Sequence, residues 1–137
     1  MTASLIRPEV GEITGLPNRP ALMFQENRLL PWFSALKNVS AVCPEEKARC
    51  MLKKAFIYED MHKLPAELSG GMCRRTALAR ALCFDADFLL LDEPFTGLDP
   101  GLREKMAELI IDRCLPAIVV THSEQDAQLL GGSIVEL

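Results

Sequence analysis

The sequence predicts an α/β domain built around a parallel β-sheet. From residue 88 onward, two short apolar runs, 88–91 and 117–120, flank a stretch with helical periodicity. Such runs are typical of strands buried on both faces, and strands that alternate with helices favour a parallel sheet with right-handed crossovers. The chain has 137 residues, which is the length of one domain with its own hydrophobic core.

The composition is that of an ordinary globular protein. Hydrophobic residues make up 49% of the chain and charged residues 25%, and the net charge of −4 argues against a nucleic-acid partner, which usually needs a basic patch. No apolar run reaches the roughly 18 residues of a membrane span, and residues 1–6 do not resemble a signal peptide.

The cysteines show neither C-x-x-C spacing nor zinc-binding spacing with histidine. An odd number without framework spacing favours reduced thiols in a cytosolic protein. We expect all five to behave as small hydrophobic residues in or near the core: Cys43, Cys50, Cys73, Cys83 and Cys114.

The first part of the chain predicts two strands and one helix. Residues 11–15 predict a short strand and a turn, and the apolar run 21–24 predicts a buried strand that ends at Gln25. Apolar residues then recur with helical spacing over 44–58, where Pro44 suits the first helical position.

The remainder predicts three helices and three strands. The helices are expected from Ser69 to Leu82, from Pro100 to Ile110 and from Ser123 to Leu130. Asp99 fits the N-cap of the second of these, and Ser123 with Asp126 matches a capping box for the third. The strands are expected at 88–91, 117–120 and 133–136.

Two carboxylates follow the apolar run 88–91. Asp92 and Glu93 come at its carboxyl end, where open α/β sheets bind their ligands. Adjacent carboxylates there suit a magnesium nucleotide, because one can hold the metal through a water and the next can orient the attacking water. The alternative is a strand that happens to end in acidic turn residues.

Further residues suit contact with phosphate. Ser69, Gly70 and Gly71 offer a hydroxyl and close backbone N–H groups at the start of a helix, unless they form a simple turn. His122 follows a strand and could contact a γ-phosphate, whereas a lone histidine or a lone Gln25 is more often a surface residue. The loop that normally holds the nucleotide, G-x-x-x-x-G-K-[ST], occurs nowhere in the chain.

The order and spacing of these motifs strongly resemble the ATP-binding cassette (ABC) ATPase family. The matching segments are Gln25 for the Q-loop, 68–72 for the signature, 88–92 for the Walker B strand, Glu93 for the catalytic glutamate, 97–99 for the D-loop and His122 for the switch histidine. The resemblance implies a partial P-loop NTPase (RecA-like) fold, with a parallel-sheet core and an inserted α-helical subdomain.

The resemblance implies one partial domain over residues 1–137. Residues 1–24 would form a residual β segment, 25–84 the Q-loop and helical signature subdomain, and 85–137 the Walker B and switch-histidine core. Because residues 5–13 resemble the family segment just after the P-loop helix, we expect an N-terminally truncated cassette.

The resemblance also implies a role for each matched residue. Glu93 and His122 would be catalytic, and Asp92 and Gln25 would hold Mg²⁺ through water. The residues implied to bind ATP are Gln25, Ser69, Gly70, Gly71, Asp92 and Asp99.

The segment 24–32 more specifically resembles the cassette subunit of bacterial importers for nitrate, sulfonates or taurine. This implies ATP hydrolysis coupled to solute transport by a cytoplasmic subunit peripheral to the inner face of the membrane. Trp32 and Phe33 would contact the transmembrane permease, unless they pack inside the helical subdomain. Two residues depart from the family pattern, Arg74 where most members carry glutamine and Cys73, and we expect both to affect fine tuning only.

The missing loop limits the expected activity. The loop supplies four or five hydrogen bonds to the phosphates, each worth about 1.5–3 kcal/mol. Micromolar ATP binding has a total free energy of only ~8 kcal/mol, so we expect the chain alone not to bind ATP usefully. It would pair head to tail with a second, complete cassette, and the strand 117–120 would expose an apolar edge. The alternatives are a non-catalytic pseudo-cassette and, less favoured, a soluble ABC protein of DNA repair or translation.

Overall fold

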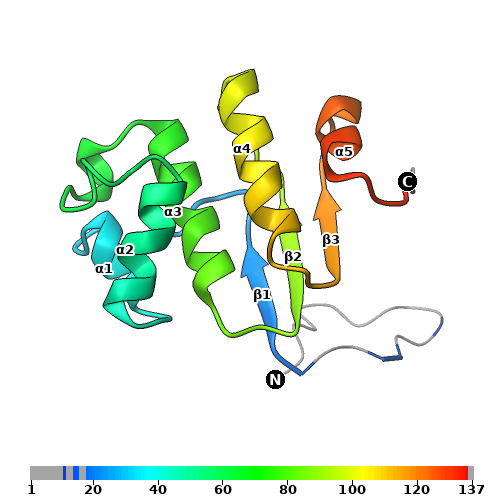
Figure 1. Ribbon diagram of the computed structural model, residues 1–137, viewed down its shortest axis with the longest axis horizontal. Coiled ribbons are helices and arrows are strands. Elements are labelled where there is room, and N and C mark those ends of the chain that lie inside the picture. Colours follow the sequence, from blue (N-terminus) through cyan, green and yellow to red (C-terminus); the bar gives the residue numbers. More distant parts are fainter. Residues whose placement is uncertain (1–10, 12–13, 16–17, 136–137) are drawn as a thin grey trace.

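The computed structural model describes residues 11, 14–15 and 18–135. The elements run in the order β1 (Pro20–Met23), α1 (Ala35–Ser40), α2 (Glu45–Lys54), the 3₁₀ helix η1 (Pro65–Glu67), α3 (Gly70–Cys83), β2 (Phe88–Asp92), α4 (Pro100–Ile111), β3 (Ala117–Val120) and α5 (Glu124–Leu130), as Figure 1 shows. The predicted α/β class with a parallel sheet is therefore confirmed.

The three strands form one parallel sheet in the order β1-β2-β3. Leu89 pairs with Ala21 on one side and with Ala117 on the other. Because β2 lies in the middle, the residue that follows it emerges at the centre of the sheet's carboxyl edge. This register places the candidate site.

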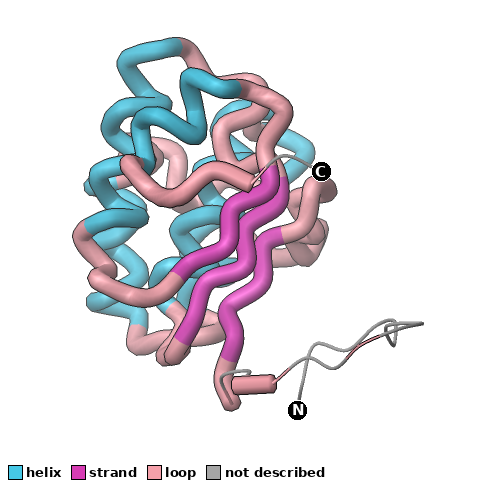
Figure 2. Tube along the Cα trace, turned by 90° about the vertical axis from the view of Figure 1, so that its right-hand side faces the viewer, coloured by secondary structure: helices cyan, strands magenta, loops and turns pink. Residues whose placement is uncertain are grey.

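One face of the sheet is covered and the other is open among the described residues. Leu89 and Leu91 are fully buried within the core that includes residues of α3 and α4, and the helices lie to one side of the strands in Figure 2. On the opposite face, Ile118 and Val120 are 55% and 48% exposed. The prediction of strands buried on both faces is therefore wrong, because no described helix covers the second face.

The helices α1, α2 and η1 lie beside α3, away from the sheet (Figure 1). Val39 of α1 and Leu52 of α2 are fully buried in the same apolar cluster as Leu82 of α3. The helix α3 therefore joins this helical part to the sheet. The sequence reading did not predict α1 or η1, which have only six and three residues and too few turns to show a period.

Several expected boundaries held and others did not. Asp99 caps α4 by accepting from the Leu102 amide, and Ser123 caps α5 by accepting from the Asp126 amide. The helix α2 is shorter than expected, and Pro44 is its N-cap rather than its first residue. Residues 133–135 are not a strand, so that prediction is wrong; of the predicted strand and turn 11–15, residues 11, 14 and 15 are not in a strand, and residues 12, 13 and 136 lie outside the described residues.

The cysteine prediction is only partly right. Cys83 is buried and Cys43 and Cys73 are half-buried, but Cys50 and Cys114 are exposed. All five are free thiols. Burial raises the pKa of the Cys83 thiol to about 12, with Cys43 as a smaller contribution.

Candidate functional site

The centre of the candidate site is Glu93, directly after β2. Its Oε1 accepts a hydrogen bond of 2.8 Å from the His122 amide and lies 3.6 Å from the His122 Nε2. The Glu93 side chain is 14% exposed and that of His122 is 94% exposed. The carboxylate is thus held by the backbone, whereas the imidazole stays accessible to a ligand.

Backbone pairing brings these two segments together. The Glu93 amide donates to the Val120 carbonyl at 2.8 Å, which continues the β2–β3 ladder by one residue. Glu93 has a φ of 50°, in the left-handed region that a non-glycine residue seldom adopts. Residues held in such conformations cluster at functional sites.

Asp92 is the last residue of β2. By strand alternation it shares a face with Leu90 and Val120, which is the open face of the sheet. Its carboxylate makes no hydrogen bond or ion pair with any described residue. It is therefore available to a ligand.

The acidic corner, formed by Asp92 and Glu93 at the carboxyl end of β2, has metal ligands that fit Mg²⁺ but no group that fits a triphosphate tail. Mg²⁺ is usually held by one or two carboxylates with waters and substrate phosphates, and Asp92 offers such a carboxylate. The described residues contain no group of three or more His, Cys, Asp and Glu that could hold a metal by themselves. The chain also lacks the G-x-x-x-x-G-K-[ST] sequence that would cradle phosphates.

Gln25 follows β1, and its side chain is exposed. The segment that begins at Gln25 is hydrogen-bonded to Asn38 of α1, whose side chain is fully buried. The Asn38 carboxamide accepts from the Leu30 amide at 2.8 Å and donates to the carbonyls of Leu30 and Phe33. The buried Asn38 carboxamide therefore fixes the backbone at Leu30 and Phe33, in the loop that follows Gln25.

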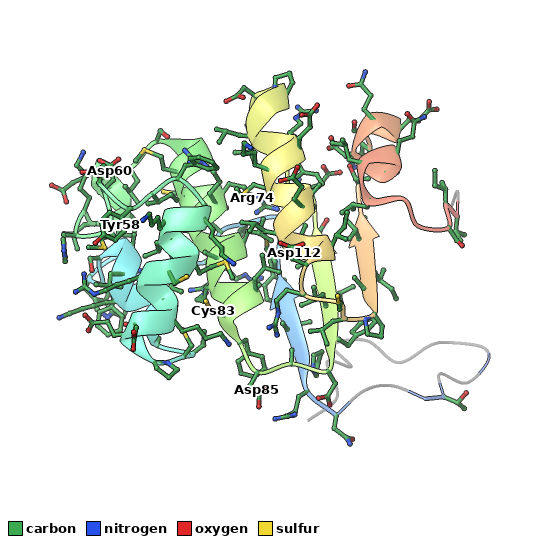
Figure 3. All side chains as sticks on the ribbon, in the orientation of Figure 1. Tyr58, Asp60, Arg74, Cys83, Asp85 and Asp112 are labelled. Carbon is green, nitrogen blue, oxygen red and sulfur yellow. The ribbon has the colours of Figure 1, made fainter. Side chains whose placement is uncertain are left out.

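Arg74 connects Gln25 to the acidic corner. It is 3% exposed, and it extends from α3 toward the carboxyl ends of β1 and β2 (Figure 3). Its guanidinium donates to the carbonyls of Phe24 and Gln25, both at 2.8 Å, and to Asn27 Oδ1 at 3.1 Å. It also donates to the carbonyls of Asp92 and Glu93.

The sequence reading missed this contribution of Arg74. The available signal was a pair of adjacent cations, Arg74 and Arg75, in a helix whose other residues are mostly apolar, because a cation that packs inside a protein needs acceptors. Burial lowers the pKa of Arg74, and the charges of Asp92 and Glu93 oppose that effect.

The signature residues lie at the N-terminus of α3. Ser69 Oγ accepts from the Met72 amide at 3.2 Å, so this hydroxyl caps the helix. A Cβ built on Gly71 would lie 3.1 Å from the Gly97 carbonyl oxygen, so the signature packs tightly against the segment after Glu93. Ser69, Gly70 and Gly71 make no hydrogen bond to Glu93 or His122.

The two aromatic residues of the predicted permease contact differ in exposure. Trp32 is 69% exposed, so the alternative that it packs inside the helical part is wrong. Phe33 is half-buried, and its carbonyl accepts from Asn38. No helix in the described part of the chain combines the length and the apolar character that a membrane-spanning segment needs.

The fold and the site are those of an α/β domain with an acidic pair and a histidine at the carboxyl edge of a parallel sheet, the edge at which open α/β sheets bind their ligands. A family model described as ABC transporter matches residues 3–96. The chain belongs to the ABC transporter family, and its fold is that of the P-loop NTPase cassettes.

Individual relatives agree with this assignment. The aliphatic sulfonates import ATP-binding protein SsuB 2 of Pseudomonas syringae pv. syringae is 39% identical in an alignment that covers 98% of this chain and 52% of that protein. The thiamine import ATP-binding protein ThiQ of Salmonella paratyphi A is 37% identical, over 90% of this chain and 58% of that protein. The chain thus spans about half the length of the curated relatives it matches.

A solved structure shares the fold. A dimeric post-hydrolysis state of the ATP-binding cassette MJ0796 bound to ADP and Pi superposes with a TM-score of 0.73 at 29% identity. The match covers 81% of this chain and 55% of that chain.

Proposed function

We propose that this chain forms the part of an importer's ATP-binding cassette that carries the Q-loop, the signature and the hydrolytic residues. The observation that carries the proposal is the Glu93 carboxylate, 2.8 Å from the His122 amide at the carboxyl end of the central strand. The import ATP-binding proteins among its relatives support the same role.

Each residue of the corner has a part in this proposal. Glu93 orients the attacking water, and His122, whose imidazole is exposed, contacts the γ-phosphate. Asp92 and Gln25 would hold a bound Mg²⁺ through water. A bound Mg²⁺ supplies charge stabilisation to the phosphoryl group that is transferred.

The 137-residue chain alone binds ATP weakly in this proposal. The contacts of a phosphate-binding loop are absent from its sequence, and losing even ~3 kcal/mol of them weakens binding roughly a hundredfold. Equilibrium binding of a labelled ATP in the presence of Mg²⁺ tests this directly. Low-micromolar affinity of the isolated chain would overturn it.

A second cassette that has a phosphate-binding loop is the proposed partner. In a head-to-tail pair, Ser69, Gly70 and Gly71 cover the ATP held by that partner, whereas Glu93 serves a site without the loop. We expect Ser69→Ala to lower the ATPase activity of the mixed pair and Glu93→Gln to leave it unchanged.

The Ser69 test needs a control because this hydroxyl also caps α3. Ser69→Asp keeps an N-cap acceptor but replaces the hydroxyl by a negative charge, so it preserves the helix and repels the nucleotide. Equal activity of the mixed pair with wild type, Ser69→Ala and Ser69→Asp would favour the alternative, a non-catalytic pseudo-cassette that regulates its partner.

In this proposal the exposed Trp32, together with Phe33, contacts the permease, and the chain lies at the cytoplasmic face of the membrane. Trp32→Ala should then weaken co-purification with the permease while leaving the unfolding midpoint of the chain unchanged. Undiminished co-purification of the Trp32→Ala chain would refute this contact.

A further inference from the structure

We propose that Arg74 is a positioning residue that clamps the Gln25 segment to the Asp92–Glu93 corner, so that neither moves independently of the other. The Arg74 guanidinium donates to carbonyls of both segments. Gln25 lies 49 residues and Asp92 lies 18 residues from Arg74 along the chain. Its relevance to catalysis rests on the proposed function, but the clamp itself is tested without nucleotide.

The geometry of the donors carries this inference. Arginine presents its five N–H donors in a rigid planar fork, so groups bound to different nitrogens keep a fixed separation. Arg74 Nη1 donates to the Gln25 segment, where Phe24, Gln25 and Asn27 provide the acceptors. Nε and Nη2 take the acidic side, where the Glu93 carbonyl accepts at 3.0 and 2.6 Å.

The acidic side needs such support. Glu93 has a φ of 50° and stands directly before Pro94, a combination that costs free energy unless the surroundings fix it. Arg74 donates to the carbonyls of the two peptides that flank Glu93, those of Asp92 and of Glu93 itself. It thereby holds the turn that points the Glu93 carboxylate at His122.

The neighbouring arginine provides a matched control. Arg75 is also buried, at 8% exposed, and it also donates to backbone carbonyls, but these belong to Ala55 and Phe56 in the helical part and to Gly71, one turn earlier in α3. Removing Arg75 therefore removes a buried cation from the same helix without touching the corner.

Hydrogen exchange followed by mass spectrometry on the full chain tests the clamp. In Arg74→Gln we expect about tenfold faster exchange, which corresponds to about 1.4 kcal/mol, in both segments 24–30 and 92–98, and no change in 52–58. Arg75→Gln should show the reverse pattern. Faster exchange in only one of the two segments, or an equal rise over 52–58 in Arg74→Gln, would overturn the proposal.

A second variant tests transmission through Arg74, and its result as a single variant does not depend on the folding of Arg74→Gln. Asn27→Ala removes only an acceptor on the Gln25 side. We expect faster exchange in 92–98 when Arg74 is present and no additional rise when it is glutamine. Unchanged exchange in 92–98 in the Asn27→Ala single variant would refute the coupling. Because no ATP is added, this result is independent of the nucleotide-binding experiment.

Discussion

Truncating apolar side chains on the two faces of the sheet should have very different costs. Leu91 of β2 is fully buried, whereas Ile118 of β3 is 55% exposed on the opposite face. Leu91→Ala removes core contacts and leaves a cavity, which costs about 2–5 kcal/mol. Ile118→Ala gives up less than half of a burial worth about 1.5–3 kcal/mol, so we expect about 1 kcal/mol or less.

Urea unfolding measures this difference. Far-ultraviolet circular dichroism follows the helices, and the fluorescence of Trp32, the chain's single tryptophan, follows the helical part. Both variants should keep the wild-type m-value, so that the midpoint alone reports stability. If Ile118→Ala destabilised the chain as much as Leu91→Ala, the open face would be a buried surface and the reasoning would fail.

The same face should also drive self-association. Ile118 and Val120 lie together on β3, an edge strand of the described sheet, and such apolar edges invite pairing with other chains. Ile118→Lys should therefore lower the sedimenting mass at high concentration. Tyr58→Lys is the matched control, because Tyr58 is 43% exposed on the helical part. An equal effect of both substitutions would remove the sheet face as the cause.

Two further predictions concern thiol reactivity and the segment after Gln25. At pH 8, the exposed Cys50 and Cys114 should be alkylated first and Cys83 last. A pKa of about 12 gives Cys83 about a thousandfold less thiolate than the ordinary pKa of 9.0 would, so Cys83 should react only as the pH approaches 12. Mass spectrometry after a short iodoacetamide pulse checks this order, and early labelling of Cys83 would contradict it. Asn38→Ala should cost about 1–3 kcal/mol, because it leaves the half-buried Leu30 amide without its acceptor and the carbonyls of Leu30 and Phe33 without their donor. A urea midpoint equal to that of wild type would refute this.

The sequence could predict the elements with strong periodicity. The helices α3 and α4 and the strands β2 and β3 fall close to their expected bounds, because a full helical stripe or a continuous apolar run decides them locally. The open face could not be predicted, since an apolar strand has the same pattern whether one or both of its faces are covered. Residues 133–135 had a strand-like composition but pair with no strand in the described part of the chain.

The contacts of the site were harder to predict than its members. Glu93 and His122 were singled out from motif spacing, and their proximity follows from β2–β3 pairing. The hydrogen-bond partners of Arg74 and Asn38 are mostly backbone groups, carbonyls that accept from them and the Leu30 amide that donates to Asn38, and backbone groups carry no residue-specific signal. Only the tertiary fold assigns them.

The corner divides its chemistry between backbone and side chains. Its shape is fixed by backbone groups: the Glu93 amide, the carbonyls around Arg74 and the His122 amide. Three side chains remain accessible to a ligand: those of Asp92, His122 and Gln25. The signature is arranged in the opposite way, since the Ser69 hydroxyl already caps α3. A nucleotide that engages Ser69 must therefore compete with this cap or share its oxygen, whereas a ligand at the corner displaces no internal hydrogen bond of Asp92. In the proposed function, the corner is therefore preorganised for its ligand, whereas the signature reaches its ligand-binding geometry only at some cost to the start of α3.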